Sequence, residues 1–310
     1  MVLGLAGLAN VWRAAHDAYQ LPAAVGEAII AAAAAVWAIL LCLYAAKWWL
    51  APRFAIEELY HPVQCCFVGL IGVATMLIAI GALPYDRTAG IGLFAAGSLF
   101  TAGFAVWRTG LLWQGGRQDS DTTAVLYLPT VAGFFVTGTT AAALGHPDWG
   151  QLAFGAGLFS WFAIESILVH RLFTAPSLVP ALRPTLGIQV APPVVGAVCY
   201  VSVTSGPPDV FLHALIGYGM LQSLFLLRLL PWILRQPFAA SYWAFTFGAT
   251  SLAAAPLRMV ARGAEGPLAV LAPFLLAAAT AVVAVIALCS LRLLLKGRLF
   301  PRLAEAAGPN

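Results

Sequence analysis

Two residues of opposite charge lie inside long apolar stretches of this sequence, where a charge is costly and needs a partner. Glu165 occurs in SWFAIESILVHRLF and Arg228 in FLLRLLPW, at similar depths in their stretches. A carboxylate in such a position could relay protons or bind an ion, whereas two opposite charges could hold neighbouring helices together. We favour a structural ion pair between Glu165 and Arg228 over a proton relay.

The other groups that could do chemistry do not form a reactive cluster. The five histidines fall in turns or near the ends of apolar stretches on different connections, so they predict neither a metal site nor haem ligation. The nearest aspartate pair, Asp119 and Asp121, occurs in the polar turn WQGGRQDSDTT and is expected to be solvated. We therefore expect no catalytic residue, no metal and no cofactor.

The composition of the chain requires a lipid environment. Of its 310 residues, 62% are hydrophobic and only 9% are charged, and the mean hydropathy is +0.90. No water-soluble domain could bury that much apolar surface, and a bilayer core needs roughly 20 apolar residues per helix. We predict an all-α polytopic membrane protein with one transmembrane domain over residues 1–300 and a short, disordered cytoplasmic tail over 301–310. The spans expected after the apolar opening segment 1–11, which is too short to cross alone, are 24–46, 63–83, 89–107, 124–143, 150–169, 186–204, 209–232, 240–257 and 267–291.

The spacing of these stretches indicates an internal repeat. The first member of each successive pair begins near residues 1, 63, 124, 186 and 240, at intervals of 62, 61, 62 and 54 residues. This regularity predicts ten transmembrane helices arranged as five tandem hairpins. Because a hairpin returns the chain to its starting side, the five odd-numbered helices would be parallel and could surround a central pore, with the even-numbered helices outside.

The odd-numbered stretches differ from the even ones in their prolines and in their lack of charge. Pro62, Pro129 and Pro192–Pro193 would bend these helices and free backbone groups, which in a bilayer must face protein or a water-filled cavity. The cores of the odd-numbered stretches contain no Lys, Arg, Asp or Glu. A charge-free lining favours passive permeation over ion-coupled pumping, which usually needs ionisable groups at mid-membrane.

The distribution of basic residues predicts the orientation. Twelve of the 16 Lys and Arg residues follow the even-numbered stretches or lie at their inner ends, and the other side has only Arg13, Arg87, Arg258 and Arg262. Positive residues accumulate on the cytoplasmic side, so both termini should be cytoplasmic. The net charge of +4 then reflects topology and gives no reason to expect nucleic-acid binding.

Several segments of this chain resemble a known family of membrane proteins. They are HPVQCCFVGLIGVATMLIA, LLWQGG, LYLPTVAG, FGAGLFSWFAIE, LGIQVAPP, GYGMLQSLFLLRLLPWI and YWAFTFG. In order and spacing they are similar to the TehA-type tellurite-resistance/dicarboxylate transporter family, which includes plant guard-cell slow anion channels. The resemblance extends from Leu3 to Gly297, and its most specific part is GYGMLQSLFLLRLLPWI.

The resemblance implies a homotrimer with one pore per subunit, formed by five tandem hairpins and closed by a phenylalanine of the ninth helix. The matching residue in WAFTFG is Phe247, and Gly248 beside it would leave room for the side chain to swing. Residues at three- or four-residue steps on the same helical face would line the pore, namely Ala244, Thr250 and Ser251. Pro129 and Pro192 would bend the lining.

The start of the chain departs from the family pattern. The family's first helix begins with a segment like FGIPLGLAAL, whereas this chain opens MVLGLAGLAN, with Val2 where the proline would lie. The resemblance therefore assigns no pore residue before Leu5.

These observations together predict a passive anion channel of the inner membrane, with tellurite resistance and C4-dicarboxylate transport as family functions. The expected partners are small inorganic or carboxylate anions, membrane lipids and two further copies of the chain. A proton-coupled dicarboxylate or tellurite-linked carrier is the main alternative. A membrane scaffold without ion current is a third.

Overall fold

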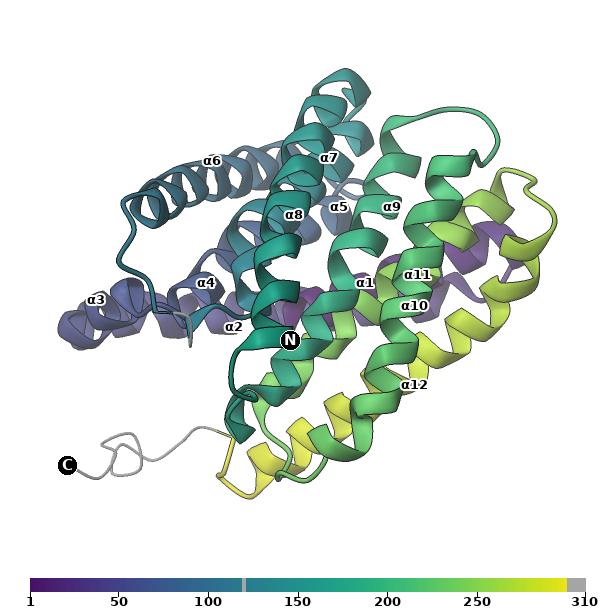
Figure 1. Cartoon of the computed structure of the whole chain (residues 1–310). Coiled ribbons are helices and arrows are strands. Elements are labelled where there is room, and N and C mark those ends of the chain that lie inside the picture. Colours follow the sequence, from purple (N-terminus) through teal and green to yellow (C-terminus); the bar gives the residue numbers. More distant parts are fainter. Residues whose placement is uncertain (119–120, 300–310) are drawn as a thin grey trace.

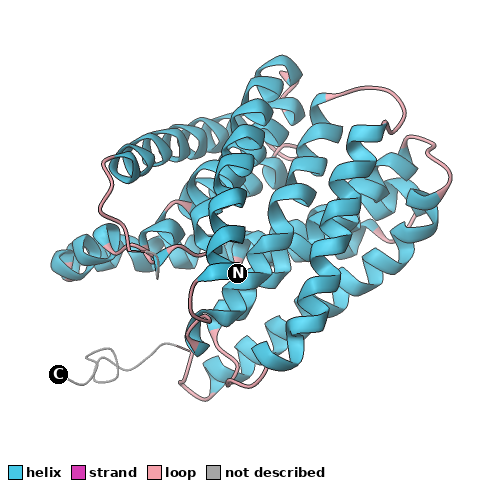
Figure 2. Cartoon of the chain, viewed as in Figure 1, coloured by secondary structure: helices cyan, strands magenta, loops and turns pink. Residues whose placement is uncertain are grey.

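The computed structural model describes residues 1–118 and 121–299, and every regular element in this part of the chain is helical (Figure 2). The predicted all-α fold class is therefore confirmed. Asp119 and the predicted tail over 301–310 lie outside the described residues. The long, mostly exposed helices are α2 (Ala23–Leu50), α6 (Arg87–Trp113), α8 (Pro147–Thr174), α10 (Val210–Ile233) and α12 (Pro267–Leu295).

Five further helical segments alternate with these along the chain. They are α1 (Val2–Tyr19), α4 with α5 (Cys65–Val68 and Leu70–Ala82), η2 and η3 with α7 (Ala124–Leu126, Leu128–Ala132 and Gly133–Ala143), η4 with α9 (Pro180–Val190 and Ala191–Val203), and η5 with α11 (Ala240–Trp243 and Ala244–Ala261). We call these the inner segments, because most of their residues are buried. The short helix α3 (Pro52–Tyr60) follows α2.

Eight of the long segments are apolar and long enough to cross a bilayer, so the chain is a multi-span membrane protein. They are the five outer helices and the inner segments Cys65–Ala82, Ala124–Ala143 and Pro180–Val203. The three inner segments are 72–83% buried over their most apolar windows, whereas the five outer helices are only 11–33% buried. The apolar side chains of the outer helices are therefore available to lipid, and those of the inner segments pack within the protein.

The inner segments contact one another in a closed order. Helix α1 packs against α5, α5 against α7, α7 against α9, α9 against α11, and α11 again against α1. Each also packs against the outer helix that follows it in the chain, as α5 does against α6 and α7 does against α8 (Figure 1). The inner segments thus form a ring of neighbours inside a layer of outer helices.

Helix α1 is longer than the apolar opening segment suggested. It continues from Val2 through Arg13 to Tyr19, and its 18 residues correspond to about 27 Å at 1.5 Å per residue. The guanidinium of Arg13 donates two hydrogen bonds of 2.8 Å to the carboxylate of Glu27 on α2. This bidentate ion pair neutralises the charge, so the helix can continue past it.

Four of the inner segments begin with irregular backbone. Gly69 interrupts the helix between α4 and α5, a π segment containing Pro129 precedes α7, and 3₁₀ segments precede α9 and α11. Pro184 lies within the segment before α9, and Pro192 and Pro193 occupy the first turn of α9. The irregular backbone before α7 and α9 coincides with proline, which lacks the N–H that a regular helix requires, whereas α4 and the 3₁₀ segment before α11 contain no proline.

Glycines allow the inner helices to approach closely. A side chain at Gly7 of α1 would overlap the Thr250 hydroxyl of α11. A Cβ at Gly138 of α7 would lie 2.6 Å from the Cys199 Sγ of α9 and 2.8 Å from the Gly150 carbonyl oxygen of α8. Close backbone contact of this kind is how helices associate where lipid provides no hydrophobic driving force.

Candidate functional site

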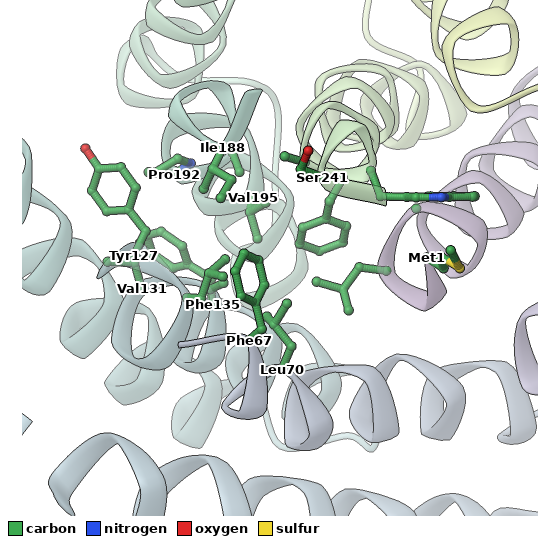
Figure 3. A pocket seen from close by; sticks show the side chains of 18 of the residues that line it. Met1, Phe67, Leu70, Tyr127, Val131, Phe135, Ile188, Pro192, Val195 and Ser241 are labelled. Carbon is green, nitrogen blue, oxygen red and sulfur yellow. The ribbon is translucent and has the colours of Figure 1, made fainter. Parts of the chain in front are cut away.

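A cavity of about 170 Å³ lies among the irregular ends of the inner segments, and we call it the Tyr127 cavity. All five inner segments contribute to its wall, and the lining is almost entirely apolar (Figure 3). The residues that line it are Met1, Leu3, Gly4, Phe67, Leu70, Tyr127, Leu128, Val131, Ala132, Phe135, Ile188, Ala191, Pro192, Val195, Ala240, Ser241, Trp243, Ala244 and Phe247.

A second, much smaller cavity of about 30 Å³ lies among the regular parts of the same helices, and we call it the Arg258 cavity. It too is lined from α1, α5, α7, α9 and α11, but its wall includes several polar side chains. The residues that line it are Gly7, Asn10, Leu77, Ile80, Val136, Thr139, Val195, Val198, Phe247, Thr250, Ser251, Ala254 and Arg258.

Two residues line both cavities, and they are Phe247 of α11 and Val195 of α9. The Phe247 side chain is half-buried and packs with the apolar core. The two cavities therefore meet at a constriction made by one aromatic ring and one branched aliphatic side chain. The ring predicted to close a pore stands at this constriction.

The other residues predicted to line a pore are divided between the two cavities. Ala244 and Pro192 line the Tyr127 cavity, and Thr250 and Ser251 line the Arg258 cavity. The hydroxyl of Thr250 donates to the backbone carbonyls of Thr246 and Phe247, at 3.0 and 3.1 Å, so it bonds its own helix.

Pro129 lines neither cavity, although it was predicted to shape the lining. It is buried in the π segment, and its neighbours Leu128, Val131 and Ala132 line the Tyr127 cavity instead. Gly248, expected to leave room for the Phe247 side chain, lies close to another segment. A Cβ there would lie 3.1 Å from the Val190 Cβ, so Gly248 also serves the contact between α11 and η4.

Arg258, the charged residue that lines the smaller cavity, is not among the residues predicted from the sequence to line a pore. Arg258 was placed just beyond the ninth span, but α11 continues to Ala261 and Arg258 lines the smaller cavity. A charge therefore lines this cavity just beyond the expected ninth span, whose own residues 240–257 contain none. Arg258 follows Phe247 by eleven residues, which is about three helical turns, so the spacing places both on one face of α11. This helical spacing is the sequence feature that could have identified Arg258 as a residue on the same face as Phe247.

The predicted ion pair between Glu165 and Arg228 is absent from the described part of the chain. The ion pairs found there are Arg13–Glu27, Lys47–Glu58 and Arg53–Glu57. Arg228 is exposed on α10. It can extend its long side chain toward the membrane surface, so it does not need the carboxylate as a partner.

Glu165 instead accepts hydrogen bonds from neutral side chains, and we call this group the Glu165 network. Its carboxylate accepts from the hydroxyl of Tyr127, from Trp161 Nε1 at 2.8 Å, from the Tyr218 hydroxyl at 2.7 Å and from Gln222 Nε2 at 3.4 Å. Gln222 also donates to the Tyr218 hydroxyl at 2.8 Å. The network therefore links α8 and α10 to the inner segment that contains Tyr127.

Tyr127 connects the Glu165 network to the larger cavity. Its ring forms part of the cavity wall, and Figure 3 shows its hydroxyl directed away from the other labelled side chains. Because the hydroxyl donates to Glu165, the carboxylate fixes the ring at the irregular start of this inner segment. Sequence reasoning identified Glu165 as unusual but could not show which partners it has.

No group of three or more His, Cys, Asp or Glu side chains that could hold a metal occurs in residues 1–118 and 121–299. The arrangement consists of two cavities, one constriction and one arginine. These groups can control the passage of a solute through the ring of inner helices by size, by hydration and by charge.

A multi-span helical protein with a cavity on each side of an internal constriction belongs, by its architecture, to the class of membrane transport proteins. Residues 1–291 match the SLAC1 family, which is described as "voltage-dependent anion channel". The chain belongs to this family, and the sequence-based recognition is confirmed.

Two named relatives support the same assignment. The chain is similar to the tellurite resistance protein TehA homolog of Haemophilus influenzae, with 36% identity over 256 residues, which cover 81% of this chain and 76% of the relative. It is also similar to the uncharacterized transporter MJ0762 of Methanocaldococcus jannaschii, with 23% identity over 233 residues, which cover 67% and 68% of the two chains. The family is thus one of channels and transporters.

Proposed function

We propose that this protein is a passive anion channel whose pore runs through both cavities and is closed by Phe247. The observation that supports the proposal best is that all five inner segments line each cavity, while only Phe247 and Val195 line both. A conduit surrounded by five helices and narrowed at a single level is the geometry that a gate requires.

The physical basis of closure is the apolar character of the constriction. An aromatic ring and a valine side chain offer no polar atom to replace the hydration shell of an ion. Water is expelled from such a constriction, and an ion faces the full cost of dehydration there. Selectivity in the open state would then depend on dehydration cost, pore width and weak dipoles, and the basic residues near the predicted cytoplasmic ends would favour anions.

The proposal includes the arrangement expected from the sequence. The inner segments and the outer helices would form ten transmembrane helices in five tandem hairpins, with α1 and α11 completing the ring. Both termini would be cytoplasmic, the membrane would be the inner (plasma) membrane of the cell, and the functional unit would be a homotrimer with one pore per subunit. The cyclic packing of the inner segments and the burial difference between the two layers support the pore arrangement. The name of the Haemophilus relative suggests tellurite resistance as a physiological context, and C4-dicarboxylates remain candidate solutes.

Planar-bilayer recording of the purified protein tests the proposal. Phe247→Ala should raise the anion conductance several-fold or more above that of the wild type. Phe245→Ala is the matched control, because Phe245 lies on the same helix, packs against Gly187 and lines neither cavity. An unchanged current for Phe247→Ala, in protein with an unaltered oligomeric mass, would remove the gate assignment.

A proton-coupled carrier is a second candidate because of the Glu165 network. A carboxylate linked through Tyr127 to the wall of the larger cavity could couple protonation to solute movement. A reconstituted flux assay separates the two mechanisms. A channel gives voltage-driven anion currents without a pH gradient, whereas a carrier requires the gradient, saturates with solute and loses coupling in Glu165→Gln.

A further inference from the structure

We propose that Arg258 forms an anion-binding site on the far side of Phe247 from the Tyr127 cavity, and that this site holds one small anion. The proposal deepens the function above and rests on it. The site consists of the Arg258 guanidinium and the polar wall of the Arg258 cavity.

The charge of Arg258 has no ionic partner among the described residues. Its Nη1 donates to the Ser202 Oγ of α9 at 2.6 Å, which is a neutral acceptor. No carboxylate lies within 4.0 Å of it, and Asp17 of α1 attracts it only from beyond that distance. Arg13, at the same end of the molecule, is by contrast neutralised by Glu27. Arg258 is partly buried, and a cation withdrawn from water without a counter-charge is unfavourable, so a mobile anion would complete the site.

The wall of the Arg258 cavity provides further donors. Asn10 of α1 and Ser251 of α11 also line the cavity and can donate from an amide and a hydroxyl. Thr139 lines it as well, but its hydroxyl donates to the Phe135 carbonyl at 3.0 Å. A charged donor and two neutral donors from three different places on the wall are suited to an anion and would repel a cation.

The size of the Arg258 cavity limits the anion that it can hold. The cavity has a volume of about 30 Å³, which is roughly the share of one water molecule in the liquid. A halide ion is of comparable size, whereas a C4-dicarboxylate would require the surrounding side chains to move. The site therefore favours a monatomic or similarly small anion.

A second, exposed cation lies close to Arg258. Arg262, just past the end of α11, donates to the carbonyls of Val201 at 2.8 Å and Thr204 at 3.3 Å. Helix α9 thus fixes both guanidinium groups, one at the surface and one in the cavity. Two cations at i and i+4 repel each other, and an anion moving between them would relieve that repulsion.

Conduction measurements in the Phe247→Ala background test the site. We expect Arg258→Gln to raise the half-saturating chloride concentration of the single-channel conductance several-fold and to lower the chloride-over-potassium permeability ratio obtained from the reversal potential. Arg258→Lys, which keeps the charge, should retain most of the selectivity. Arg87→Gln is the matched control, because Arg87 is on the same predicted side, donates to the Leu144 carbonyl and lines neither cavity.

An equilibrium measurement makes the test independent of conduction. Chloride, compared with the much larger gluconate, should raise the melting temperature of the wild type and of Arg87→Gln but not of Arg258→Gln, because a ligand stabilises the state that binds it. A chloride effect that persists in Arg258→Gln would overturn the inference. The inference would also be overturned if Arg258→Gln, in a conducting Phe247→Ala background, changed neither the half-saturating chloride concentration nor the reversal potential. That result would leave the proposed channel function intact. Failure of Phe247→Ala to conduct would instead contradict the channel, and the melting experiment would still decide the anion site.

Discussion

The two cavities on either side of Phe247 are built by the same five inner segments but differ in backbone, size and polarity. The Tyr127 cavity has a volume of about 170 Å³, is bordered by π and 3₁₀ backbone and is almost entirely apolar. The Arg258 cavity has a volume of about 30 Å³, is bordered by regular α-helix and contains the guanidinium of Arg258. One ring of helices can therefore enclose a wide apolar cavity at one level and a narrow, more polar cavity at another.

The difference in backbone explains the difference in width. Regular helices can pack closely through glycines, as Gly7 does against Thr250, and they leave little space between them. Segments interrupted by proline or by 3₁₀ turns cannot maintain this packing over their full length. The Tyr127 cavity lies where four inner segments have irregular backbone, and the Arg258 cavity lies where they are regular α-helix.

The largest further effect on the anion current should come from narrowing the constriction again at its other residue, Val195. In the conducting Phe247→Ala background, Val195→Phe places an aromatic ring at the other residue shared by both cavities. We expect it to reduce the current several-fold, back toward the wild-type level, in planar-bilayer recordings.

Val131→Phe in the same background is the control, since Val131 lines only the wide Tyr127 cavity. It should reduce the current much less than Val195→Phe. Equal reductions by the two substitutions would show that the constriction is not confined to the level of Phe247 and Val195.

An intermediate effect should follow from disrupting the Glu165 network, which supports the wide cavity from outside. Glu165→Ala removes the acceptor of the Tyr127, Tyr218 and Trp161 donors, and each buried donor left unsatisfied costs about 1–3 kcal/mol. We expect a clear fall in melting temperature in detergent, and a smaller fall for Glu165→Gln, which keeps an acceptor oxygen.

Arg228→Ala should leave the melting temperature nearly unchanged, because Arg228 is exposed and lies outside this network. If Arg228→Ala were as destabilising as Glu165→Ala, the ion pair expected from the sequence would have to be reinstated.

The smallest effect should come from the cap of α10, which is remote from both cavities. The Asp209 carboxylate accepts a hydrogen bond from the Tyr200 hydroxyl and one of 2.8 Å from the Leu212 N–H, and these bonds hold its pKa below the usual value. Asp209→Ala should cost about 0.5–2 kcal/mol at neutral pH, as loss of an N-cap does.

The pH dependence of that loss follows from the lowered pKa. The stabilisation is present above the unfolded-state pKa and is lost as the pH falls through the folded-state value. The melting temperatures of wild type and Asp209→Ala should therefore begin to converge below about pH 4 and should meet only below the folded-state pKa. A difference that stayed constant down to pH 2 would contradict the role assigned to the carboxylate.

Much of the fold was predictable because membrane helices follow simple rules of length and hydropathy. The apolar stretches locate eight of the long segments, and the prolines at positions 129, 184, 192 and 193 explain why two of the buried ones begin irregularly. The contrast between inner and outer segments follows from the same residues, since freed backbone groups cannot face lipid. The position of Phe247, in turn, followed from family resemblance and could not be obtained from hydropathy.

The remainder depended on contacts that no local pattern specifies. Glu165 and Arg228 lie at similar depths in the sequence pattern, but which side chains surround the carboxylate depends on how α8, α10 and Tyr127 pack. Arg258 was excluded because the apolar stretch ends before it, whereas the helix continues and Ser202 of another helix stabilises it. Helix length and tertiary partners are set by packing, so sequence alone gives them poorly.

The interlocking of α1 with α11 limits how the constriction can change. Gly7 lies under both Thr250 and the Phe247 ring, so any axial sliding of α11 would drive the Thr250 side chain into the backbone of α1. The Phe247 ring can then move only by rotation about its own side-chain bonds, while the backbone of α11 stays in place. The opening proposed at Phe247 would then need no rearrangement of the subunit's helices.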